Sequence, residues 1–197
     1  MDDIVQQAMA KWPNVPAVFG WLSLSRRGEW RIKGERISNP IVTDFINRNY
    51  ACDGLGRWFF QNGPQRVYVS LDYTPVVYRF ADKHQIETHT GMPVGSFENV
   101  LIDEAGALLL KTNHGMGLVD DRDLNSFLSL LVDKNTNTLS PGAIDMLAIL
   151  PPDKWHGLLI KISGKIFSVE NILSADVPTL FGFNPAPRQV EGEEECY

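Results

Sequence analysis

Two ten-residue segments of this chain, 78 positions apart, share the pattern of a β-hairpin. Residues 24–33 and 102–111 each contain a strand pattern, a tight turn around a glycine (Gly28 or Gly106) and a second strand pattern. Both segments lead into a stretch with helical periodicity. A duplicated supersecondary unit decides the architecture of a chain. The sequence therefore predicts an α+β fold of two related lobes, each a β-hairpin followed by a helix and further antiparallel strands.

The turn and breaker residues place the boundaries of these lobes. The first lobe, with an N-terminal helix, is predicted at 1–83, and its last part is an antiparallel meander of strands at 58–61, 66–71 and 76–80. Residues 84–97 contain Gly91, Pro93 and Gly95 with little periodicity, which predicts a connector. The second lobe follows at 98–183, and 184–197 reads as a disordered acidic tail.

Large apolar side chains on the predicted strands of the first lobe form its expected core. The residues predicted to be largely buried there are Trp30, Ile32, Trp58, Val67 and Val69.

Composition and charge narrow the choice of partners and cofactors. A net charge of −6 disfavours nucleic acid, whose phosphates require clustered cations. An acidic N-terminus and the lack of an apolar stretch of ~20 residues predict no membrane partner and a cytoplasmic protein. Two cysteines, Cys52 and Cys196, predict neither a structural disulfide nor a zinc site, and His84 and His89 lack the spacing of zinc ligands. No cofactor or metal is predicted.

The best candidate for a ligand site is the glycine-rich segment that follows the second hairpin. Glycines let backbone amides approach a ligand, and the predicted helix after the segment would direct its positive end toward an anion. The alternative is a structural turn whose aspartates cap that helix. Both interpretations remain open at this point. The predicted ligand-binding residues are Asn113, His114, Gly115, Gly117, Asp120 and Asp121.

The segment from Tyr50 to Val69 (YACDGLGRWFFQNGPQRVYV) resembles a block from an uncharacterised proteobacterial family, a domain of unknown function. The order of elements is also similar to that of a second uncharacterised proteobacterial family. The segments that carry this second likeness are Gly28-Glu-Trp30, Asp53 to Trp58, Val67 to Val77 and Thr112-Asn113-His114-Gly115. The second resemblance implies an α+β fold of two related motifs and a part in signalling or ligand sensing, and it supplies no catalytic residues.

Two functions are compatible with this sequence. The first is a non-enzymatic module of the cytoplasm that senses a ligand or binds a protein in signalling; its partner, a small molecule or a protein, is unknown. The alternative is a small hydrolase or transferase with a site between the lobes, in which His114 and Asp120 or Asp121 act as acid and base. Since no motif of nucleophilic, phosphate-binding or metal-dependent catalysis is present, the sequence favours the first function and predicts no catalytic residue.

Overall fold

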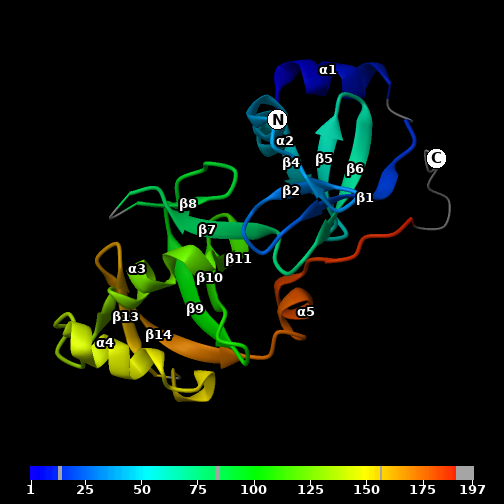
Figure 1. Ribbon diagram of the computed structural model, residues 1–197. Coiled ribbons are helices and arrows are strands. Elements are labelled where there is room, and N and C mark those ends of the chain that lie inside the picture. The colour runs from blue at the N-terminus through cyan, green and yellow to red at the C-terminus, as the bar shows by residue number, and fades with distance from the viewer. Residues whose placement is uncertain (13–14, 83–84, 156, 190–197) are drawn as a thin grey trace. The chain divides into compact units, whose positions relative to one another are not determined.

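The computed structural model describes residues 1–12, 15–82, 85–155 and 157–189, and within these ranges the chain has an α+β fold with two mixed β-sheets (Figure 1). It divides into two compact units. The first contains Met1–Pro75, His89–Gly91 and the C-terminal segment from Phe181, and the second contains Val76–Thr88 and Met92–Leu180. The division therefore falls after Pro75, whereas the sequence analysis placed the end of the first lobe at residue 83.

The first unit holds a six-stranded sheet in the order β3-β2-β1-β6-β5-β4. Strands β1 and β6 are parallel, and every other neighbouring pair is antiparallel. The strands are β1 (Val18–Leu24), β2 (Trp30–Ile32), β3 (Glu35–Arg36), β4 (Tyr50–Cys52), β5 (Trp58–Asn62) and β6 (Gln65–Leu71).

Two helices, α1 (Asp3–Lys11) and α2 (Pro40–Arg48), belong to the first unit. Helix α2 begins with capping chemistry typical of a helix N-terminus: Pro40 lies in its first turn, and the Asn39 side chain accepts a hydrogen bond of 2.9 Å from the backbone N–H of Ile41. The helix packs on the sheet through Ile46, which is buried, and through Phe45, whose ring meets that of Phe60 edge-on at 5.4 Å. An apolar stripe on one side of the helix thus covers part of one sheet face.

The second unit holds an eight-stranded sheet in the order β12-β13-β14-β9-β10-β11-β7-β8. Its strands are β7 (Val76–Phe80), β8 (Ile86–Thr88), β9 (Phe97–Asp103), β10 (Leu108–Thr112), β11 (Gly115–Val119), β12 (Leu131–Val132), β13 (Leu159–Ile162) and β14 (Lys165–Ile172). The helical segments after β11 are η1 (Asp121–Asp123), α3 (Leu124–Leu128), α4 (Pro141–Ala148), η2 (Pro152–Trp155) and α5 (Val177–Phe181).

Six strands of the second sheet repeat the arrangement of the first. The order β11-β10-β9-β14-β13-β12 corresponds strand for strand to β3-β2-β1-β6-β5-β4. The single parallel pair, β9 with β14, corresponds to β1 with β6. The hairpin registers also agree: Leu24 pairs with Trp30, and Ile102, 78 positions later, pairs with Leu108. The predicted hairpins around Gly28 and Gly106 therefore occupy equivalent places in the two sheets.

The predicted meander is wrong in its third strand. Strand β7 belongs to the second sheet, where it pairs with β11 in parallel and with β8 in antiparallel orientation. The predicted connector at 84–97 contains β8 and the first residue of β9. Alternation of polar and apolar residues shows which side chains share a face of a strand, but it does not choose the strand's partner.

The predicted core of the first lobe is confirmed only in part. Trp30 and Val69 are buried, whereas Trp58 and Val67 are half-buried and Ile32 is 46% exposed, so the prediction for Ile32 is wrong. Ile32 borders an open cavity of the first unit.

Asn184 and Pro185, the first two residues of the predicted disordered tail, form backbone hydrogen bonds with the first unit. The backbone N–H of Asn184 donates to the carbonyl of Gly56 at 2.8 Å, and that of Leu71 donates to the carbonyl of Pro185 at 2.8 Å. The segment thus packs on the first unit through backbone hydrogen bonds. Residues 190–197, with Cys196, lie outside the described ranges, as do His84 and His156.

Candidate ligand-binding site

Asn113 and His114 form the turn of the β10–β11 hairpin, and their polar groups bond within the unit. The Asn113 Oδ1 atom accepts hydrogen bonds of 3.0 Å from the backbone N–H groups of Gly95 and Ser96. The backbone N–H of His114 donates to Thr112 Oγ1 at 3.0 Å, and the His114 ring Nε2 donates to the Pro93 carbonyl at 2.9 Å. Through these bonds both side chains hold the segment before β9 in place.

Gly115 and Gly117 belong to strand β11 and not to a loop. The Tyr78 hydroxyl donates to the Gly115 carbonyl at 3.0 Å and lies 2.7 Å from Thr112 Oγ1. A Cβ atom on Gly117 would lie 2.8 Å from both Cδ2 of Tyr78 and the carbonyl oxygen of Val76. Burial raises the pKa of Tyr78 to about 12, so its hydroxyl keeps its proton at neutral pH. Gly117 therefore makes room for a buried tyrosine, whereas Gly115 has a φ of +102°, a conformation that favours glycine.

Asp120 and Asp121 lie at the other end of β11. Asp120 is buried, its Oδ1 accepts a bond of 3.0 Å from the backbone N–H of Arg122, and its carboxylate forms an ion pair with the Arg122 guanidinium. This is the capping role that the sequence analysis held as its alternative. Because the five residues of β11 separate His114 from Asp120, about 20 Å of extended chain lies between them. The expectation that one strand-to-helix junction gathers these residues is wrong.

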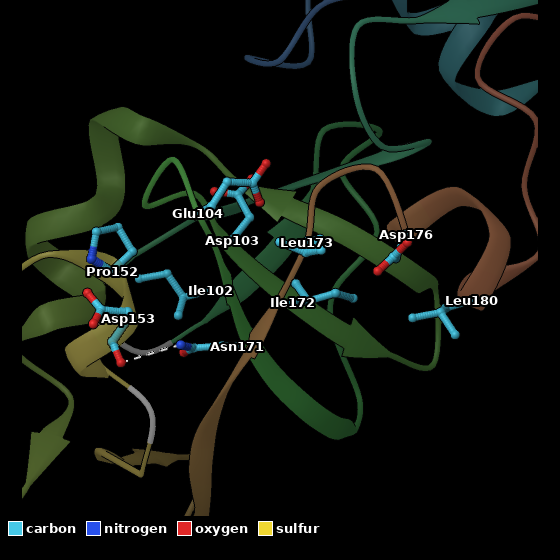
Figure 2. Close-up of a pocket in the computed structure, with 10 residues that line it drawn as sticks. All are labelled: Ile102, Asp103, Glu104, Pro152, Asp153, Asn171, Ile172, Leu173, Asp176 and Leu180. Atoms are coloured by element: carbon cyan, nitrogen blue, oxygen red, sulfur yellow. Dashed lines mark hydrogen bonds between the residues drawn. The ribbon is translucent and has the colours of Figure 1, made fainter.

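A pocket of about 450 Å³ opens elsewhere in the second unit, at the carboxyl ends of the parallel strands β9 and β14 (Figure 2). The strands end in register there, with Asp103 opposite Ile172. Its apolar wall is formed by Ile102, Pro152, Ile172, Leu173 and Leu180, and its polar residues are Asp103, Glu104, Asp153, Asn171 and Asp176.

Several polar groups of this pocket are held in place by hydrogen bonds. The Glu104 carboxylate accepts a bond of 2.8 Å from the backbone N–H of Ser174 and another from the Ser174 hydroxyl. Both bonds lower the pKa of Glu104, and the bond from the Ser174 hydroxyl has the larger effect. The Asn171 side chain donates to the Asp153 carbonyl at 3.4 Å, as the dashed line in Figure 2 shows. Glu104 thus presents a fixed negative charge at the mouth of the pocket.

All ionisable side chains that line this pocket are carboxylates. Lys154, the neighbour of Asp153, forms an ion pair with it at 3.0 Å, but both side chains are more than 60% exposed, and this pair contributes little against solvent. No group of three His, Cys, Asp or Glu side chains within the described ranges has an arrangement that could hold a metal ion. The pocket therefore combines negatively charged side chains with an apolar wall.

The sequence analysis missed this pocket. Its residues come from segments 102–104, 152–153 and 171–180, which are far apart in the chain. They meet because β14 pairs in parallel with β9, whereas antiparallel strands were expected. The one available signal was the pair of carboxylates, Asp103 and Glu104, in the turn of the second predicted hairpin.

The fold and the pocket define the class of protein: an α+β protein of two units that share one strand order. The chain belongs to family DUF2944, described as "Protein of unknown function (DUF2946)", which matches residues 1–188. The sequence resemblance to an uncharacterised family is thereby confirmed. No curated protein gives a significant match to the chain.

Among solved structures, the chain is similar to a DUF1285 family protein from Silicibacter pomeroyi DSS-3, with a TM-score of 0.52 and 15% identity over 85% of this chain and 94% of that chain. A second similar structure, a DUF1285 family protein from Shewanella baltica OS155, has a TM-score of 0.39 and 16% identity over 57% of this chain and 94% of that one. At this identity the first likeness shows the fold alone. No helix of the described ranges is long and apolar enough to cross a membrane.

Proposed function

We propose that this protein is a non-enzymatic, cytoplasmic ligand-sensing module that acts in signalling and binds its ligand in the acidic pocket of the second unit. The observation that carries the proposal is the pocket itself, whose 450 Å³ volume and largely apolar wall suit a small molecule. The polar groups at its mouth are negatively charged. The ligand is a small organic cation, with its apolar part against Ile172, Leu173 and Leu180.

A role in binding another protein is the second form of this proposal, with the turn at Asn113 and His114 as its contact surface. Asn113 is exposed and His114 is half-buried at the tip of the β10–β11 hairpin. Support for this form is limited, because the bonds to Gly95, Ser96 and Pro93 already give both side chains a structural role. Nucleic acid is not a partner in this proposal, given the net charge of −6.

The alternative function, a hydrolase or transferase, requires an acid–base pair that His114 and Asp120 do not form. Proton transfer requires the two groups to lie within hydrogen-bonding reach of the same substrate, directly or through one water molecule. His114 and Asp120 lie at opposite ends of β11, and the Asp120 carboxylate is engaged by Arg122. We therefore propose no catalytic role for these residues.

We also infer that the two units are copies of one ancestral motif. The support is the shared order of six strands, the single parallel pair in each set and the hairpins that agree at an offset of 78 residues. Two copies that keep the same strand order can acquire different sites, and the acidic pocket is formed by residues of the second unit alone.

Isothermal titration calorimetry with octylammonium and octanoate tests the proposed cation site. We expect saturable binding of octylammonium and at least tenfold weaker binding of octanoate, because the pocket mouth is acidic. The double variant Asp153→Asn, Asp176→Asn should weaken octylammonium binding at least tenfold, and Asp44→Asn in the first unit should leave it unchanged. Equal binding of both compounds, or full binding by the double variant, would contradict the proposal.

A further inference from the structure

A second cavity, of about 310 Å³, lies in the first unit between helix α2 and the sheet face that it partly covers. It crosses the neighbouring strands β2, β1, β6 and β5, so it extends over about 14 Å. Ten residues line it: Val18, Trp21, Leu22, Ile32, Val42, Ile46, Phe60, Asn62, Gln65 and Val67.

The chemistry of this lining is distinct from that of the acidic pocket, because none of the ten side chains is charged. The two polar ones, Asn62 and Gln65, stand opposite each other at the end of the β5–β6 hairpin. At the other end of the cavity two charges of opposite sign lie at the rim: the Lys33 ammonium is 3.9 Å from the centre of the Trp21 ring, and Glu35 pairs with Ile32. The cavity thus presents an apolar wall, a pair of neutral amides and no net charge.

The strand order does not require this opening. Ile32 in the first unit corresponds to Leu110 in the second, since they pair with Leu22 and Val100 in registers 78 positions apart. Leu110 is completely buried, whereas Ile32 is 46% exposed, and Trp21 and Val42 beside it are 46% and 39% exposed. Leaving three large apolar side chains in water is unfavourable by about 25 cal/mol for each Å² that remains exposed. The first unit therefore has an apolar cavity at a position whose equivalent in the second unit is buried.

We propose that this cavity is a binding site for an uncharged, largely aliphatic or aromatic small molecule that carries one hydrogen-bonding group. At about 30 Å³ for each heavy atom, the volume accommodates about ten of them. The apolar body lies against Trp21, Ile32 and Val42, and the hydrogen-bonding group meets the amides of Asn62 and Gln65. A charged ligand is disfavoured, because it would lose its hydration against a wall without an opposite charge. This site is separate from the acidic pocket and does not depend on it.

The test is binding of 1-decanol to the full chain, measured by saturation-transfer NMR and calorimetry, with decanoate and decylammonium as charged compounds of equal chain length. We expect saturable binding of 1-decanol and at least tenfold weaker binding of both charged compounds to this site. The variant Val42→Trp fills the cavity from a half-exposed position on α2 and should weaken decanol binding at least tenfold. Ile41→Trp, one residue away, 78% exposed and outside the lining, is the matched control.

A second filling variant, Ile32→Trp on strand β2, keeps the test decisive if Val42→Trp disturbs folding. The proposal is overturned if 1-decanol does not bind saturably or if neither filling variant weakens its binding. It is also overturned if decanoate or decylammonium binds this cavity as tightly as 1-decanol does. That comparison uses the chain that carries Asp153→Asn and Asp176→Asn, so that the acidic pocket does not bind decylammonium. It is also overturned if sedimentation shows dimers that exclude 1-decanol and that Val42→Trp dissociates, because the occupant would then be a second copy of the chain.

Discussion

Ser25 and Asp103, 78 positions apart, accept the same pair of backbone hydrogen bonds in two equivalent turns. Ser25 Oγ accepts from the N–H groups two and four residues later, at 3.3 and 3.0 Å. Asp103 Oδ1 accepts from the corresponding N–H groups at 2.9 and 2.8 Å. Asp53 and Asp133 make the same two bonds in the turns that follow β4 and β12. One side-chain oxygen at the first turn position therefore organises four turns of this chain.

Replacement of Asp103 should show how much this arrangement stabilises the second unit. Asp103→Ala leaves two turn N–H groups without their acceptor, so we expect the free energy of unfolding to fall by about 1–3 kcal/mol. Asp103→Ser introduces the residue found at the equivalent position 25 and should restore part of that loss. Urea denaturation followed by circular dichroism measures both variants. Equal losses for alanine and serine would mean that the side-chain oxygen does not organise the turn.

Gly117→Ala tests whether this glycine serves packing. The added Cβ would meet the Tyr78 ring and the Val76 carbonyl, so we expect a loss of about 1–3 kcal/mol in stability, as overpacking typically produces. Gly142→Ala in helix α4, where a Cβ meets no atom within 4 Å, is the control and should be neutral or slightly stabilising. Differential scanning calorimetry provides the comparison. A Gly117→Ala protein that melts like the wild type would leave a ligand-binding role as the better explanation of this glycine.

Asp53 should contribute a pH-dependent part of the stability of the first unit. Burial raises the pKa of its carboxyl, but hydrogen bonds from the backbone and guanidinium of Arg57, the backbone of Leu55 and the Tyr68 hydroxyl together outweigh burial, and the net pKa is lowered. A lowered pKa in the folded state stabilises the protein above the unfolded pKa of about 3.9, and this contribution is lost as the pH falls through the folded value.

We expect Asp53→Asn to destabilise the protein by about 1–3 kcal/mol at pH 7, with a difference from the wild type that shrinks below about pH 4. Chemical denaturation between pH 3 and 7 measures this difference, and Asp44→Asn is the control. A difference that is constant over the whole range would show that the ionisation of Asp53 does not matter.

Gly56→Ala should weaken the attachment of the C-terminal segment. A Cβ on Gly56 would collide with the Gly182 carbonyl oxygen and would lie 3.1 Å from the Cα of Phe183. Gly34→Ala is the matched control, because its φ of +87° is similarly strained for alanine but no atom lies within 4 Å of the added Cβ. We expect faster hydrogen exchange at the Leu71 and Asn184 amides in Gly56→Ala alone. Unchanged protection of both amides would contradict this account.

Trp30 should be the most important tryptophan of the first unit. Its ring is buried, its Nε1 donates to Asn47 Oδ1 at 2.7 Å, and it meets the Tyr50 ring edge-on at 5.0 Å. We expect Trp30→Ala to lower the free energy of unfolding by about 3–5 kcal/mol, more than Trp58→Ala at a half-buried position. Trp12→Ala, at a side chain that is 50% exposed, should change it by about 0.5 kcal/mol or less. The same urea titration ranks the three variants, and a larger effect at Trp58 would reverse the ranking.

Local signals in the sequence predicted local structure well. The hairpins around Gly28 and Gly106 form where the turn chemistry places them. The partner of β7 was not predictable in this way, because a parallel neighbour is chosen by contacts distant in sequence. Strand β11 was mistaken for a loop, since two of its five residues are glycines. The structure explains them separately: Gly115 has a φ of +102°, and Gly117 packs against the buried Tyr78 ring.

The candidate sites were likewise predictable only where they depend on residues close together in the sequence. Sequence reasoning identified residues whose types suit a ligand, such as His114 and Asp120, but it had no means of knowing that a strand separates them. The acidic pocket depends on the parallel pairing of β9 with β14, and the apolar cavity depends on how far α2 covers the sheet. Neither relationship is encoded in a short motif, so neither site was predictable from spacing.

The packing of residues 181–189 on the first unit has a consequence for biosynthesis. The first unit requires Met1–Pro75 together with the segment from Phe181, whereas the second requires nothing beyond Leu180. Because a ribosome delivers the chain from its N-terminus and domains fold as units while they emerge, the second unit has all its residues before the first is complete. The hydrogen bond from the Leu71 amide to the Pro185 carbonyl forms only after residue 185 has been translated. In this protein the unit that is synthesised first is the last to be finished.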